Sequence, residues 1–153
     1  MKRLSLITSL FLIIIASTFA SKVSLDAKSG NRIQIIIEII RDRKSYELSA
    51  TLFDNSSASA FYSALKQGPI TVDMSDYGNF EKVGRLGMSL PRNDKMITTE
   101  PGDIILYQGN QITIYYDENT WNFTHLGKID SVSPSELRSI LGDGKIKAVF
   151  KVK

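Results

Sequence analysis

The sequence from residue 32 to residue 152 consists of short strand-like segments, which glycine, proline or polar residues separate. The first segment, residues 32–40, is rich in isoleucine and has polar side chains at positions 32, 34 and 38, as a half-buried strand requires. Residues 75–103 lack a regular pattern, and one or two further short strands are expected there, around residues 82–83 and 85–88. Similar segments follow the first at residues 45–53, 70–74, 104–107, 111–116, 121–129 and 145–152. We therefore predict a mainly β chain whose last strand pairs with its first and closes a barrel.

Two short helices are predicted between the strands. Apolar residues at positions 58, 61, 62 and 65 have helical spacing, with polar N-capping residues before them and Gly68-Pro69 after them. A second helix begins at Ser133-Pro134-Ser135-Glu136, which has the pattern of a capping box, and ends at Leu141. The expected fold is a closed β-barrel of about eight strands with two short helices, in one domain over residues 32–153.

The first twenty residues have the three parts of a secretory signal peptide. Met1-Lys2-Arg3 supplies positive charge, residues 4–15 are almost entirely apolar, and Thr18 and Ala20 are small residues at −3 and −1 of a cleavage site. This apolar stretch is shorter than the roughly twenty residues that span a bilayer, and an uncleaved anchor is the alternative interpretation. We expect a signal peptide over residues 1–20, a flexible tether over residues 21–31, and a secreted or periplasmic protein without a membrane anchor after cleavage.

We predict that the exported protein begins at Ser21, because the small residues before it fit the specificity of signal-peptide cleavage. Mass spectrometry of protein recovered from outside the cytoplasmic membrane is expected to give the mass of residues 21–153. Exported protein that retained residues 1–20 would contradict the prediction.

Composition excludes several function classes. The formal charge is +3, and Lys2 and Arg3 of the predicted signal peptide supply most of it, so the domain itself is nearly neutral. A nearly neutral surface does not attract polyanions, and we expect no nucleic-acid partner. The chain has no Cys and a single His, His125, which excludes disulfides, thiolate sites and multi-histidine metal centres. We expect no metal and no cofactor, and no serine-hydrolase elbow accompanies His125.

Aromatic residues gather in the second half of the chain, at positions 107, 115, 116, 121 and 123. Two interpretations fit them: a barrel core with ordinary surface tyrosines, or a shallow groove to which Arg85, Gln111 and Trp121 offer polar groups. Tyr115 and Tyr116 point to opposite faces of one strand, so we expect at least one of them outside the core.

The order of these elements resembles that of cyclophilins, which have two strands and a helix at the start and a short helix before the last strand. The sequence is similar in particular to the bacterial and archaeal cyclophilin-like proteins, small domains that share the cyclophilin barrel. The resemblance covers residues 32–152 and implies a cyclophilin-like barrel. Its most particular segments are residues 75–84 (SDYGNFEKVG), 101–107 (PGDIILY), 109–114 (GNQITI) and 126–129 (LGKI).

Cyclophilins are peptidyl-prolyl isomerases, and this sequence departs from the pattern of their active site. Their catalytic arginine segment has no match, and Arg85 is the only arginine in residues 75–90. Thr113 stands where cyclophilins place an aromatic floor for proline, whereas Gln111 matches the family glutamine and Trp121 a tryptophan near the pocket rim. We predict a monomeric, non-catalytic domain that binds a peptide or small molecule through Arg85, Tyr107, Gln111, Thr113 and Trp121. A weak isomerase that uses Arg85 is the alternative.

Overall fold

The computed structural model describes residues 32–153, so the predicted signal peptide and tether lie outside the described residues. Nine strands and two helices follow one another along this part of the chain. Their bounds are β1 (Gln34–Arg41), β2 (Lys44–Leu52), α1 (Ser56–Leu65), β3 (Ile70–Tyr77), β4 (Glu81–Arg85), β5 (Lys95–Thr98), β6 (Asp103–Tyr107), β7 (Gln111–Tyr115), β8 (Thr120–Ile129), α2 (Pro134–Leu141) and β9 (Ile146–Val152).

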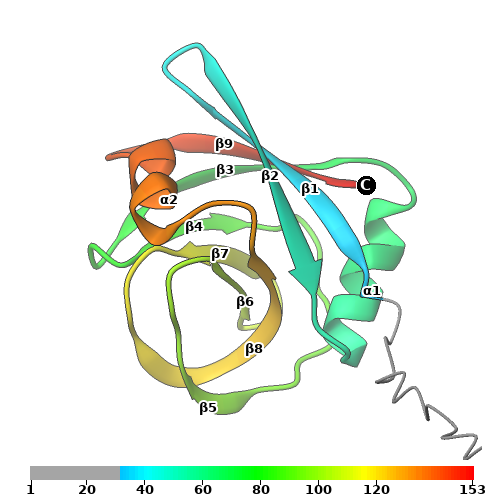
Figure 1. The fold of residues 1–153 in the computed structure, drawn as a ribbon. Coiled ribbons are helices and arrows are strands. Elements are labelled where there is room, and N and C mark those ends of the chain that lie inside the picture. The colour runs from blue at the N-terminus through cyan, green and yellow to red at the C-terminus, as the bar shows by residue number, and fades with distance from the viewer. Residues whose placement is uncertain (1–31) are drawn as a thin grey trace, which may run out of the picture.

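Eight of the strands form a closed antiparallel ring in the order β2-β1-β9-β3-β4-β7-β6-β8 (Figure 1). As predicted, the last strand, β9, pairs with the first strand, β1. The ring closes where the end of β2 pairs with β8. The remaining strand, β5, pairs with β8 and lies outside the ring. The structure confirms the predicted closed barrel of about eight strands with two short helices.

Alternation along β1 determines which side chains fill the barrel. Ile35, Ile37 and Ile39 are fully buried, whereas the residues between them are only half-buried. The helices extend this core from outside the ring. Phe61 of α1 packs edge to face against Phe150 of β9, with ring centroids 5.6 Å apart. In the part of the chain that the structure describes, no helix is long and apolar enough to cross a membrane.

Residues 75–103 contain the differences between prediction and structure. The predicted strand at residues 85–88 is wrong, because β4 ends at Arg85 and Gly87 has a φ of +80°, outside the range of a strand. The strand β5 was not predicted. Its four residues are mostly exposed, so they lack the apolar alternation by which strands are recognised in a sequence.

Successive residues of β6, and Tyr115 at the end of β7 with Tyr116 after it, belong to two different apolar clusters. Ile104 and Tyr116 pack in the barrel core, whereas Ile105 and Tyr115 form a second cluster with Phe123. Because neighbouring side chains on a strand point to opposite faces, this second cluster lies on the outer wall of the barrel. The expectation that at least one of the two tyrosines lies outside the core is wrong, because both are buried: Tyr116 packs in the barrel core and Tyr115 in the second cluster.

Candidate ligand-binding site

A cavity of about 290 Å³ lies at the second apolar cluster, on the outer wall of the barrel. Most of its lining residues are aromatic, and the rest include one carboxylate and two amides. A volume near the lower end of small-molecule sites suits one side chain or a compact molecule. The lining residues are Tyr77, Phe80, Glu81, Val83, Tyr107, Gln111, Tyr115, Asn119, Trp121 and Phe123.

Strand register brings these side chains together. Glu81 of β4 lies opposite Tyr115 of β7, and Tyr107 of β6 lies opposite Gln111 at the other end of β7. Directly opposite residues of an antiparallel pair project from the same face of the sheet. Alternate residues of three adjacent strands therefore form one wall of the cavity.

The aromatic rings of the lining form a continuous series of contacts. The rings of Phe80 and Tyr115 are nearly parallel, with centroids 5.9 Å apart, and Tyr115 is tilted against Phe123 at 5.6 Å. Tyr77 packs edge to face on Phe80, with centroids 6.0 Å apart. Trp121 lies at the rim and is 59% exposed. Buried rings thus form the floor, and exposed rings stand at the opening.

A tight turn between β3 and β4 positions two of these rings. Gly78 and Asn79 have φ values of +59° and +60°, and the backbone N–H of Phe80 donates to the Tyr77 carbonyl. Positive φ at both central residues is typical of a type I′ turn. A Cβ atom on Gly78 would lie 2.2 Å from the Phe80 ring, so glycine is required for this ring to fold over the turn.

Glu81 is the buried carboxylate of the cavity, with 7% of the residue exposed. Its Oε2 atom is inaccessible and has no hydrogen-bond partner. Burial raises the pKa of Glu81, and the neighbouring Tyr115 hydroxyl only partly opposes this effect. Burial and the nearby Glu81 carboxyl also raise the pKa of Tyr115. Perturbed carboxyl and hydroxyl groups in an aromatic cavity indicate a candidate functional site.

The structure brings three of the five predicted site residues together. Tyr107, Gln111 and Trp121 line the cavity. Arg85 lies opposite Gln111 in the strand register, but it lines a separate hollow of about 220 Å³ beside Gly87 and Asn110. Thr113 is buried between β4 and β6 and is outside the lining, and its hydroxyl has no hydrogen-bond partner.

Seven of the ten lining residues are not among the predicted site residues. Tyr115 and Phe123 belong to the aromatic group noted in the sequence, and Val83 belongs to a predicted short strand. Glu81 resembles the charged residue of an ordinary exposed strand position, and its burial depends on β7, which is distant in the sequence. Tyr77 and Phe80 had a local signal, since they flank a Gly-Asn pair typical of a tight hairpin turn. Asn119 lies in a loop and had no such signal.

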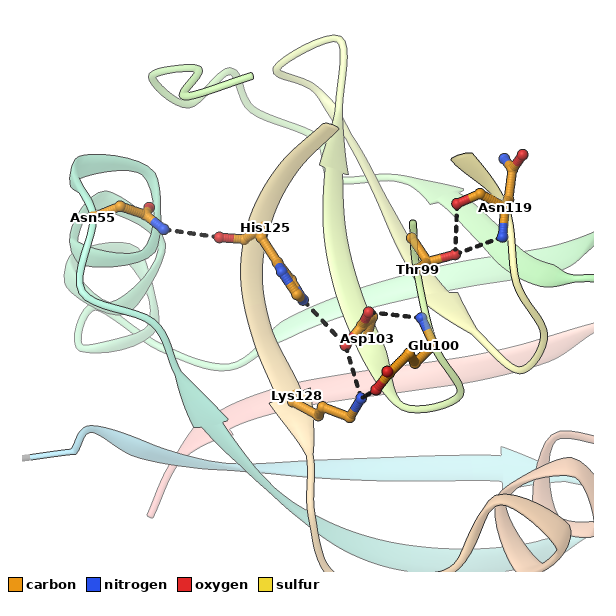
Figure 2. Close-up of polar contacts among 7 residues, drawn as sticks. All are labelled: Asn55, Thr99, Glu100, Asp103, Asn119, His125 and Lys128. Atoms are coloured by element: carbon orange, nitrogen blue, oxygen red, sulfur yellow. Dashed lines mark hydrogen bonds and ion pairs between the residues drawn. The ribbon is translucent and has the colours of Figure 1, made fainter. Parts of the chain in front are cut away.

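A polar cluster connects β6, β8 and the start of α1 (Figure 2). His125 Nε2 lies 3.1 Å from Asp103 Oδ1, and Lys128 Nζ lies 3.3 Å from the same oxygen. Asn55, the N-cap of α1, donates to the backbone carbonyl of His125. Lys128 Nζ also lies 2.7 Å from Glu100 Oε2. These contacts connect the start of α1 with β8, and β8 with β6.

The histidine–aspartate pair has no nucleophile beside it. Among residues 32–153, no Ser or Thr hydroxyl hydrogen-bonds the His125 ring, and the Phe53 ring packs on it with centroids 4.4 Å apart. A nucleophile within reach of the base is what covalent catalysis requires. The same residues contain no group of three or more His, Asp or Glu side chains arranged to hold a metal ion. The contacts that the structure shows for this pair connect β6, β8 and the start of α1.

The substitution Asp103→Asn is expected to lower the stability at neutral pH by about 1.5–3 kcal/mol, the usual contribution of a hydrogen bond to a charged group. Burial opposes ionisation of Asp103, but contacts with His125, the Glu100 N–H and Lys128 hold the pKa of this carboxyl below its ordinary value of 3.8. A lowered folded-state pKa stabilises the fold above the unfolded-state value, and this contribution is lost as the pH falls through the folded-state value. Urea unfolding across pH measures the difference.

The difference in stability between the unmodified protein and Asp103→Asn is expected to shrink as the pH falls below 3.8, the ordinary pKa of an aspartate. Asp117→Asn, at an exposed position, is the matched control and should change stability little at any pH. An Asp103→Asn deficit that stayed constant down to acid pH would show that the deficit does not come from the ionised carboxylate.

Comparison with known proteins agrees with this architecture. The model of the cyclophilin-like family matches residues 42–151, and the chain belongs to the cyclophilin-like family. Among solved structures it is similar to the solution structure of a hypothetical protein from Archaeoglobus fulgidus, with a TM-score of 0.56 and 14% identity over 82% of this chain and 99% of that chain. At this identity the similarity concerns the fold alone. Comparison with curated protein sequences finds no match.

Proposed function

We propose that this protein is an exported, monomeric binding domain that takes up one side chain of a peptide, or a small organic molecule, without chemical conversion. The observation that carries the proposal is the aromatic cavity on the outer wall of the barrel. Its floor is fixed by buried rings such as Tyr115, and its rim exposes Tyr77 and Trp121 to an incoming ligand. Such a combination of preformed apolar walls and few polar groups is typical of ligand sites.

The alternative function, peptidyl-prolyl isomerisation, has less support. The cavity supplies aromatic surface on which a proline ring can pack, although Thr113 does not contribute to it. The electrostatic part of an isomerase site has weaker support, because no arginine of residues 32–153 lines the cavity. Aromatic surface without a positively charged group favours binding over catalysis.

Fluorescence of Trp121 gives a direct test, because this residue is the only tryptophan of the chain and lies at the rim of the cavity. We would titrate the protein with the N-acetyl amides of the standard amino acids and with dipeptide amides. At least one probe is expected to change the fluorescence with saturation and to shift backbone NMR signals of the lining residues. The affinity should be weak, since each probe fills only a small cavity.

Two exposed side chains provide a matched pair of variants. Tyr77→Ala removes a rim ring and is expected to weaken the probe about five- to thirtyfold, the range that corresponds to about 1–2 kcal/mol. Met96→Ala truncates a similarly exposed residue outside the lining and should have no effect. The proposal is wrong if no probe binds, or if the shifted NMR signals cluster around another hollow, such as the one lined by Phe53.

A further inference from the structure

The cavity carries charge of one sign. Glu81 is its only charged lining residue, and no lysine or arginine of the described chain lines it. The next residue, Lys82, is fully buried. Its ammonium forms an ion pair with Asp76, with Nζ and Oδ1 2.6 Å apart, and therefore does not neutralise Glu81. This distribution favours a cationic ligand.

One oxygen of the Glu81 carboxylate lacks a partner in the described structure, although the Tyr115 hydroxyl lies beside this carboxyl. Its Oε2 atom is buried without a hydrogen bond, whereas most buried polar atoms in proteins are paired. Burial raises the pKa of Glu81, and a cation beside the carboxylate would oppose this effect, because an opposite charge favours the ionised form. A positively charged ligand would therefore compensate for the cost of burying this side chain.

The walls of the cavity suit the same kind of ligand. The rings of Phe80, Tyr115, Phe123 and Trp121 line the same cavity as Glu81. The face of an aromatic ring attracts a cation within about 6 Å of the ring centre, and tryptophan does so most strongly. Several aromatic faces together are the arrangement by which proteins bind quaternary ammonium groups.

We propose that the cavity binds an alkylammonium group, with Glu81 as its counter-charge and the aromatic rings as its walls. The inference rests on the binding function proposed above and names the class of ligand. A methylated or quaternary ammonium suits a mostly aromatic lining better than a primary ammonium, because it has few or no N–H groups that need acceptors. Such a group occurs on free amines and on methylated lysine side chains, and the experiment distinguishes these two sources.

Choline and its uncharged carbon analogue, 3,3-dimethylbutan-1-ol, are a matched pair of probes, because they have nearly the same shape and differ in charge. We would titrate the protein with each and follow the fluorescence of Trp121. Choline is expected to bind about tenfold or more tightly than the alcohol. The amide of N-acetyl-trimethyllysine is the third probe: tighter binding than choline would identify a peptide as the source of the group, and weaker binding a free amine.

Two variants separate the role of Glu81 from a general effect of charge. Glu81→Gln keeps the size of the side chain and is expected to weaken choline about tenfold while leaving the uncharged alcohol unchanged. Glu118→Gln removes an exposed carboxylate outside the lining and should alter neither probe more than about twofold. The melting temperature of Glu81→Gln is measured alongside and should not fall, because the variant no longer buries a charge.

The outcomes of these titrations can contradict the alkylammonium inference alone, or the proposed binding function together with it. If the alcohol binds as tightly as choline, or if folded Glu81→Gln binds choline like the unmodified protein, the alkylammonium inference is wrong. If neither choline nor trimethyllysine binds while uncharged amino-acid amides do, the inference also fails, but the proposed binding function stands. If no probe of either set binds, both proposals fail. Because the first comparison uses the unmodified protein, the test does not depend on the folding of a variant.

Discussion

A chain that ends at Gly142 is expected not to fold. The lost strand, β9, lies between β1 and β3 and pairs with both, so its removal opens the ring and leaves two strand edges unpaired. The truncation also removes the buried side chains of Ile146 and Phe150. Burial of two such side chains contributes roughly 3–6 kcal/mol, which is comparable with the whole stability of a small domain, about 5–15 kcal/mol. Circular dichroism should show no cooperative thermal transition.

Two controls link this result to the missing strand. A chain that ends at Val152 loses only the exposed Lys153 and should melt like the unmodified protein. A synthetic peptide of residues 143–153, added to the truncated chain, should restore part of the cooperative transition by filling the gap in the ring. A truncated protein with a normal cooperative melt on its own would show that the closed ring is not needed for folding.

Local patterns predicted most of the barrel. The alternation of β1 and the glycine-containing hairpin between β6 and β7 are properties of short segments, and both elements form where they were expected. The second helix begins as predicted, because the Ser133 side chain accepts from the Glu136 N–H and the Glu136 carboxylate accepts from the Ser133 N–H. Interactions within a few residues of the chain determine such features, and they can be identified without knowledge of the fold.

The candidate site depends on register, which the sequence does not reveal. Glu81 meets Tyr115 because β4 and β7 pair in one particular alignment, and a shift by one residue would place Lys82 in the cavity instead. The contact of His125 with Asp103 also depends on the register of two paired strands. The pairing of β6 with β8 is irregular between Ile104 and Ile105, and this irregularity sets which residues of β8 lie beside Asp103.

The same dependence explains the different outcomes for the predicted site residues. Gln111 and Arg85 are direct partners across β4 and β7, yet Gln111 lines the cavity and Arg85 lines the neighbouring hollow. The pairing of two residues across neighbouring strands therefore predicts that they lie close together, but not that they line the same cavity.

The rate of peptidyl-prolyl isomerisation is expected to be at least about 10²- to 10³-fold lower than that of true cyclophilins. This is the usual effect of removing one positioned electrostatic group. Rotation about an X-Pro bond has a barrier of about 18–20 kcal/mol, and an enzyme must polarise the rotating amide to lower it. The charged residue of this cavity is Glu81, whose ionised form can only accept hydrogen bonds. Arg85, the candidate donor in the sequence, lines a separate hollow.

A standard assay with an X-Pro peptide measures this activity, and Arg85→Ala is the decisive variant. We expect turnover close to the uncatalysed rate and no further change in the variant, because the arginine does not reach a proline bound between the aromatic rings. Tight binding of an X-Pro peptide without turnover would agree with the prediction, since aromatic surface alone supplies affinity and leaves the rotational barrier in place. Turnover near that of a true cyclophilin, lost in Arg85→Ala, would instead show that Arg85 moves into the cavity and that the protein is an isomerase.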